Sequence, residues 1–160
     1  MKKSFLYIAF IALTFNLSTV NAQTECDSRV LKNELYNMLK PDYRYDKSKV
    51  TEVTIKNVSQ GGEIGVPILS TEKYRLLFNT AGFPTDVEIR VYDKAMGEDG
   101  RQLLYSIEEE KKAGKTVFMF KPSVEHFKTI YIDYVIPAVT DDALLGQKGC
   151  IVFLMGYKVG

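Results

Sequence analysis

Nucleophilic catalysis by this chain would depend on its single histidine, His126, which lies in the polar stretch KPSVEHFK. A serine or cysteine nucleophile needs a base within hydrogen-bonding distance. No G-x-S-x-G motif is present, and VSQGG at positions 58–62 is typical of a turn. A lone histidine on a polar segment is more often an ordinary surface residue than a catalytic base. We therefore expect the chain not to be an enzyme.

The chain also offers few side chains that could bind a metal ion. One histidine and the cysteines Cys26 and Cys150 cannot make a nitrogen and sulfur site for zinc. Calcium binds six or more oxygen atoms, and the acidic residues of YDKAMGEDG, Asp93, Glu98 and Asp99, are the candidates for it. Acidic residues beside glycine are also common in turns. We expect no metal and no other cofactor, with calcium at this loop left as an open alternative.

Tyrosines are the candidates for ligand binding. The chain has ten tyrosines and no tryptophan, and Tyr43, Tyr45 and Tyr92 lie on polar segments. Exposed aromatic rings of this kind could stack on sugars, which makes carbohydrate binding a hypothesis. Tyrosine also fills half-buried strand positions routinely, because its ring is apolar and its hydroxyl is polar.

The first 22 residues form the pattern of a secretory signal peptide. Lys2 and Lys3 begin it, the apolar stretch 5–15 follows, and Val20-Asn21-Ala22 resembles a cleavage site. The apolar stretch is shorter than the roughly 20 residues of a membrane helix. Lipid attachment at Cys26 is disfavoured because Glu25 directly precedes it. We expect a signal peptide over 1–22, a single domain over 23–160, and a periplasmic or secreted protein without membrane insertion.

Charge excludes one class of partner. The 160-residue chain has 21 Lys and Arg against 20 Asp and Glu; removing Lys2 and Lys3 leaves 19 against 20, a net charge of −1. A protein that binds nucleic acid normally carries a basic surface. We therefore expect no nucleic-acid partner, and a protein or glycan of the cell envelope instead. The sequence does not indicate an oligomeric state.

The two cysteines, Cys26 and Cys150, predict a disulfide. An even number of cysteines in an exported chain favours bonding. Two buried thiols and an intermolecular bond are the alternatives.

A helix should open the domain. From Asp27, apolar residues recur at helical spacing, and Pro41 should end the helix. Asp27 or Ser28 can cap its first amides. The apolar positions are Val30, Leu31, Leu35, Met38 and Leu39.

Short alternating segments then predict strands. After a polar connection, DYRYDKSK, they are KVTEVTIKN, EIGVPILS, EKYRLLFNTA, DVEIRVYD, RQLLYSIE, KTVFMFKP, TIYIDYVIP and KGCIVFLMGYK. Pro67 favours an edge position for the second of these. A charged hairpin loop, EEEKKAGK, should close around Gly114. We predict a mainly β fold: an antiparallel, jelly-roll-like β-sandwich of about eight strands with one helix packed on a sheet.

The last strand is apolar on both faces. Cys150, Val152 and Leu154 share one face, and the other carries Ile151, Phe153, Met155 and Tyr157. Because both faces need a cover, we expect the opposite sheet on one and the helix on the other. The alternative is a central strand unrelated to helix and cysteines. The segment TIYIDYVIP should be its neighbour.

These last two segments, TIYIDYVIP and KGCIVFLMGYK, together with the signal peptide and the short length, resemble small exported proteins of Bacteroidota-type bacteria. More loosely, the chain resembles the jelly-roll modules found beside secreted peptidases. The resemblance implies a compartment and a fold, but no reaction. The expected function is a non-enzymatic binding or structural domain of the cell envelope, and the alternative is a carbohydrate-binding module that acts with separate enzymes.

Overall fold

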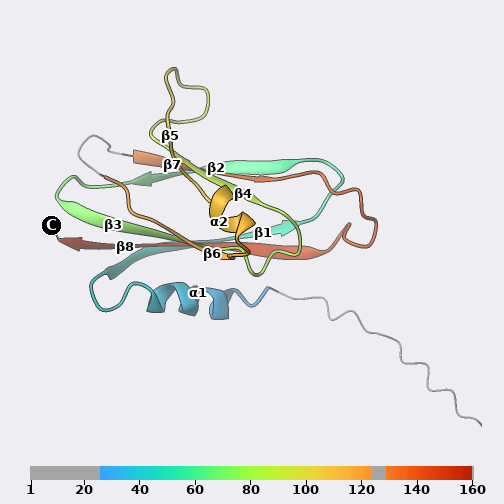
Figure 1. Cartoon of the computed structure of the whole chain (residues 1–160), viewed down its shortest axis with the longest axis horizontal. Coiled ribbons are helices and arrows are strands. Elements are labelled where there is room, and N and C mark those ends of the chain that lie inside the picture. Colours follow the sequence, from blue (N-terminus) through green and yellow to red (C-terminus); the bar gives the residue numbers. More distant parts are fainter. Residues whose placement is uncertain (1–25, 124–128, 160) are drawn as a thin grey trace, which may run out of the picture.

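The computed structural model describes residues 26–123 and 129–159, which form two antiparallel four-stranded sheets facing each other (Figure 1). The first sheet contains, in spatial order, β1 (Arg44–Thr54), β8 (Lys148–Val159), β3 (Glu72–Asn79) and β6 (Val117–Phe120). The second contains β2 (Gln60–Pro67), β7 (Thr129–Ile136), β4 (Glu88–Tyr92) and β5 (Leu103–Ser106). The predicted β-sandwich is confirmed. The expected signal peptide, 1–22, and His126 lie outside the described residues.

Strand pairing follows the nested order of a jelly roll. The first strand pairs with the eighth, the second with the seventh, the third with the sixth and the fourth with the fifth, all antiparallel. A long two-stranded ribbon with these pairs, rolled up on itself, gives two sheets. In the rolled ribbon, β1 lies at one border of the first sheet and β2 lies at one border of the second. Pro67 therefore lies on an edge strand, as predicted.

Helix α1 (Ser28–Asn37) packs on the outer face of the first sheet (Figure 1). The Asp27 carboxylate caps it by accepting hydrogen bonds from the amides of Arg29 and Val30. Leu35 and Leu39 are fully buried against the sheet. Val30 is 60% exposed, so its assignment to the apolar face was wrong. Successive side chains of an α-helix point about 100° apart around its axis. Val30 therefore points away from the apolar stripe that begins at Leu31.

Strand β8 is covered on both faces, as predicted. Ile151, Phe153 and Met155 point into the core between the sheets. Cys150, Val152 and Leu154 point the other way, into a second apolar cluster with Leu35, Leu39 and Leu77. β8 is an inner strand of its sheet, and the helix and the disulfide are both attached to it, so the alternative of a central strand unrelated to helix and cysteines is wrong.

A disulfide joins Cys26 to Cys150, with their Cα atoms 5.6 Å apart. Cys150 is completely buried in the cluster beneath α1. The bond attaches the chain two residues before α1 to the strand that α1 covers. The predicted intramolecular pairing is confirmed.

Gly156 allows Leu39, in the turn that follows α1, to approach β8 closely. A Cβ atom at this position would lie 2.6 Å from Leu39 Cδ2 and 2.7 Å from the Arg44 carbonyl oxygen. Both distances are shorter than real Cβ contacts, and the second neighbour is backbone. Only glycine therefore fits here without displacement of α1 or β1.

Four further local predictions were wrong. VSQGG is not simply a turn, because β2 begins at Gln60 and pairs with β7 from there on. DYRYDKSK, predicted to be a connection, is mostly strand, because β1 begins at Arg44. The backbone of β1 pairs with β8 along its whole length, and this pairing does not require apolar side chains. EEEKKAGK contains a short helix, α2 (Glu108–Lys112), whose side chains form ion pairs within and just beyond it. β7 is not a neighbour of β8 but lies in the opposite sheet, since alternation reports which face is buried and not which strand is adjacent.

Removal of the disulfide should destabilise the fold strongly. The C26A/C150A variant should lose about 3–5 kcal/mol of unfolding free energy, because the bond restricts a long loop in the unfolded chain. The two residues are 124 positions apart. Urea unfolding followed by circular dichroism measures this. Wild-type protein in reductant should unfold at the same urea concentration as the variant, and an unchanged midpoint for the variant would contradict the assignment.

Alanine at Gly156 should also destabilise the fold. The new Cβ overpacks the contact between Leu39 and β8, at a cost of about 1–3 kcal/mol. Gly65 on β2 is the matched control, because a Cβ there has no neighbour closer than 3.6 Å. G65A should change stability by less than about 1 kcal/mol, in the stabilising direction. Equal losses in the two variants would show that close packing at Gly156 is not the cause.

Candidate functional site

Two exposed tyrosines meet where α1 runs beside β1. Tyr36 and Tyr45 are 43% and 40% exposed, and their ring centroids lie 6.2 Å apart with 53° between the ring planes. Lys40 Nζ lies 5.1 Å from the Tyr36 centroid, and Lys32 Nζ lies 5.4 Å from that of Tyr45. We call these four residues the tyrosine–lysine patch. It contains Tyr45, one of the candidates from the sequence, and Tyr36, which the sequence analysis missed.

The local sequence explains how the patch forms. Lys32 and Tyr36 are four residues apart and lie along one flank of α1, and Lys40 follows in the turn after the helix. Tyr45 is paired with Gly156 and therefore shares the face of the sheet on which α1 packs. The Tyr45 hydroxyl is 3.0 Å from Ser48 Oγ, which fixes the end of the ring.

The patch is positively charged. Among the described residues, neither Lys32 nor Lys40 forms a salt bridge. Each lysine instead lies over an aromatic ring, an attraction worth about 0.5–1 kcal/mol at exposed sites. Both ammonium groups remain available to a negatively charged partner.

Tyr43, the second candidate, has its ring covered by cations. The Arg75 guanidinium carbon lies 4.1 Å from the ring centroid, and Lys158 Nζ lies 5.2 Å from it. Arg75 Nη1 also donates a hydrogen bond to the carbonyl oxygen of Met38, near the end of α1. Tyr43 and Arg75 together therefore fix the chain where it leaves the helix.

Tyr92, the third candidate, lies on the opposite sheet. The Arg101 guanidinium carbon lies 3.7 Å from its ring centroid. Arg101 donates to both carboxylate oxygens of Asp133 at 2.8 Å, and to Glu63 at 2.8 Å. The hydrogen bonds to Asp133 raise the pKa of the Arg101 guanidinium. Tyr92 therefore belongs to an ion-pair network, and the three candidate tyrosines share no common surface.

This network also holds the loop between β4 and β5, which projects from the sandwich (Figure 1). Glu63 accepts a hydrogen bond from the Met96 amide at 2.7 Å, and Arg101 Nε donates to the Lys94 carbonyl oxygen at 2.8 Å. The Asp93 carboxylate accepts from the Gln102 amide at 2.6 Å.

The same loop carries the residues considered for calcium, Asp93, Glu98 and Asp99. Within residues 26–123 and 129–159, no three histidine, cysteine or acidic side chains lie together in a way that could hold a metal ion. The three loop residues are therefore not assembled as a set of ligands.

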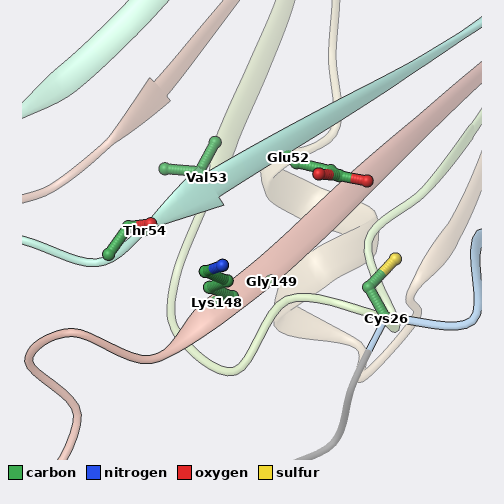
Figure 2. Close-up of a pocket in the computed structure, with 6 residues that line it drawn as sticks. All are labelled: Cys26, Glu52, Val53, Thr54, Lys148 and Gly149. Atoms are coloured by element: carbon green, nitrogen blue, oxygen red, sulfur yellow. The ribbon is translucent and has the colours of Figure 1, made fainter.

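Two cavities flank the end of β1. The larger, about 470 Å³, lies beside the disulfide and is lined by Glu52–Thr54 of β1, by Lys148 and Gly149 of β8, and by Cys26 (Figure 2). The smaller, about 290 Å³, shares Glu52–Thr54 but extends toward β2 and β7. We call the smaller one the edge cleft. Its further lining residues are Thr51, Lys56, Gln60, Gly61, Tyr134 and Ile136.

The larger cavity is lined by one acidic and one basic side chain, Glu52 and Lys148. Cys26, the first residue that the structure describes, lies beside them. Such a pair can orient a polar group but supplies neither a nucleophile nor a metal ligand set.

Neither helix of the described ranges is long and apolar enough to cross a membrane.

Comparison with known proteins found no significant match among protein-family models, curated proteins or solved structures. The resemblance to small exported proteins therefore stays a prediction, and function has to be argued from the geometry of the chain.

Loss of Arg101 should release the β4–β5 loop. In R101A the largely buried carboxylates Asp133 and Glu63 lose their counter-charge, which should cost about 2–4 kcal/mol. The Met96 amide should also exchange hydrogen faster, because its acceptor, Glu63, is no longer held in place. Chemical unfolding and amide exchange measure the two effects.

Arg90 is the matched control, because it forms an exposed ion pair with Glu88 on the same sheet. R90A should cost less than about 1 kcal/mol. A loss in R101A no larger than that in R90A would contradict the role of the network.

Proposed function

We propose that this chain is a non-enzymatic binding domain, exported to the periplasm or secreted, that recognises an acidic protein of the cell envelope. The tyrosine–lysine patch is the proposed recognition surface. The observation that supports it is the exposure of two tyrosines from two different elements, each with a lysine over its ring.

Two features support export. The first 22 residues have the pattern of a signal peptide. The Cys26–Cys150 disulfide is typical of proteins that fold outside the cytoplasm. The cell envelope is therefore the natural place for the partner.

The composition of the patch favours a protein partner. Tyrosine is enriched among the residues that contribute most to protein–protein binding, since its ring buries a large area with little loss of side-chain freedom. Lys32 and Lys40 would accelerate association with a partner of opposite charge. An acidic protein surface satisfies both properties.

The same geometry gives less support to the carbohydrate-binding alternative. Tyr36 and Tyr45 are tilted by 53°, so they do not form one flat platform for a sugar chain. Guanidinium groups lie against the rings of Tyr43 and Tyr92, and Tyr92 lies on the other sheet. A glycan that required all three candidate tyrosines could not reach them together.

The test uses residues 23–160 immobilised on a resin, with an envelope extract of the source cell applied to it. The retained protein is identified, purified and titrated against wild-type and variant domains. In Y36A/Y45A its affinity should fall about thirtyfold, the equivalent of about 2 kcal/mol. In K32Q/K40Q the association rate should fall and lose its dependence on salt.

The control is L103A, which truncates another exposed apolar side chain, on β5 of the opposite sheet. It should bind as the wild type does. Unchanged binding by Y36A/Y45A would contradict the proposal, as would retention of envelope glycan alone in a way that depends on Tyr36 and Tyr45.

A further inference from the structure

The edge cleft has the composition of a site for a small polar ligand. It lies where the border strands of the two sheets, β1 and β2, come near each other, with β7 behind them. Its volume, about 290 Å³, is just below the range of about 300–1,000 Å³ that is common for sites of drug-sized ligands. None of its lining residues belongs to the tyrosine–lysine patch.

Gly61 on β2 lines the cleft, and its neighbour Gly62 leaves room for Tyr134 of β7. A Cβ atom at Gly62 would lie 2.6 Å from the Tyr134 hydroxyl oxygen, and one at Gly61 would lie 2.6 Å from the Tyr134 carbonyl oxygen. Because both positions lack a side chain, Tyr134 lies directly against β2. Its half-buried ring then contributes an aromatic surface to the cleft.

One side chain that lines the cleft has an unused hydrogen-bonding atom. Gln60 Oε1 is buried, with almost no accessible surface, and has no partner in the part of the chain that the structure describes. A buried acceptor without a partner is unfavourable, so a rotation of the Gln60 side chain that turned this oxygen toward a donor on a bound ligand would gain free energy. A hydroxyl group can both donate and accept, and it would therefore satisfy either orientation of the Gln60 amide.

We infer that the edge cleft binds one ring of a neutral polyhydroxylated ligand, that is, a single pyranose unit. The neutral side chains of Thr51 and Gln60, which share the inner faces of their sheets, match hydroxyl groups, and Tyr134 offers a ring for the apolar face of the sugar. The charged lining residues, Glu52 and Lys56, have opposite signs, which favours a ligand without net charge.

An added peptide strand fits this edge less well. The pairing of β1 with β8 is interrupted by a bulge between Tyr45 and Lys47, and Lys47 and Lys49 follow. Bulges and lysines are the features with which border strands prevent further strand pairing. The small volume of the cleft likewise suits one ring rather than an extended segment.

The test is a titration of residues 23–160 with methyl glucoside, methyl galactoside and N-acetylglucosamine, followed by amide chemical shifts. At least one of them should bind in the millimolar range and shift the amides of Thr51, Gln60 and Gly61. Q60L and T51V should each weaken binding about fivefold or more, the effect of losing one hydrogen bond. Y36A/Y45A should bind as the wild type does, which separates this site from the patch.

Stability distinguishes a binding role for Gln60 from a structural one. Q60L should melt no lower than the wild type, because it removes an acceptor that has no partner within the domain. A clearly lower melting temperature for Q60L would overturn the inference. So would the absence of shifts at the cleft with all three sugars, or equal binding of sorbitol, an open-chain polyol without a ring face.

Discussion

The burial of β8 on both faces is the constraint on which the other elements depend. Its inner face, with Ile151, Phe153 and Met155, requires the second sheet opposite it. Its outer face, with Cys150, Val152 and Leu154, requires α1. The disulfide and the close approach at Gly156 hold the helix at both ends of this contact. Burial of an apolar side chain contributes roughly 1.5–3 kcal/mol, so an uncovered β8 would lose a large part of the stability of a domain of this size.

The covered outer face explains where exposed aromatic residues can occur. Because α1 lies over β8 and β3, it leaves the border strand β1 partly open to solvent. Tyr45 on β1 and the flank of α1 that carries Tyr36 therefore meet at the margin of the helix. On the opposite sheet no helix of the described residues covers Tyr92, and Arg101 with its two carboxylates takes that place. The two outer faces are thus closed by different means, one apolar and one ionic.

Much of this fold was predictable from the sequence, because its main signals are local. The two apolar faces of KGCIVFLMGYK, the helical stripe and the two cysteines each appear as a pattern along the chain. The neighbour of β8 was not predictable, since β7 has the same alternation that a strand beside β8 would have. Tyr36 was missed because a tyrosine within an amphipathic helix carries no sign of what lies beside it. Gln60 became notable only through Tyr134 and β1, which are far from it in the chain.

Strand β1 connects the two proposed sites physically. Its first half carries Tyr45 and its second half, from Thr51 to Thr54, lines the edge cleft. Among the strands of the described residues, β1 is hydrogen-bonded to β8 alone, so β8 determines the position of both halves. A border strand that pairs on one side only is held less firmly than a central one. The same anchoring of β8 by α1 and the disulfide therefore supports both proposed sites, the one for a protein and the one for a sugar. Any loosening of that anchor would affect both sites through β1.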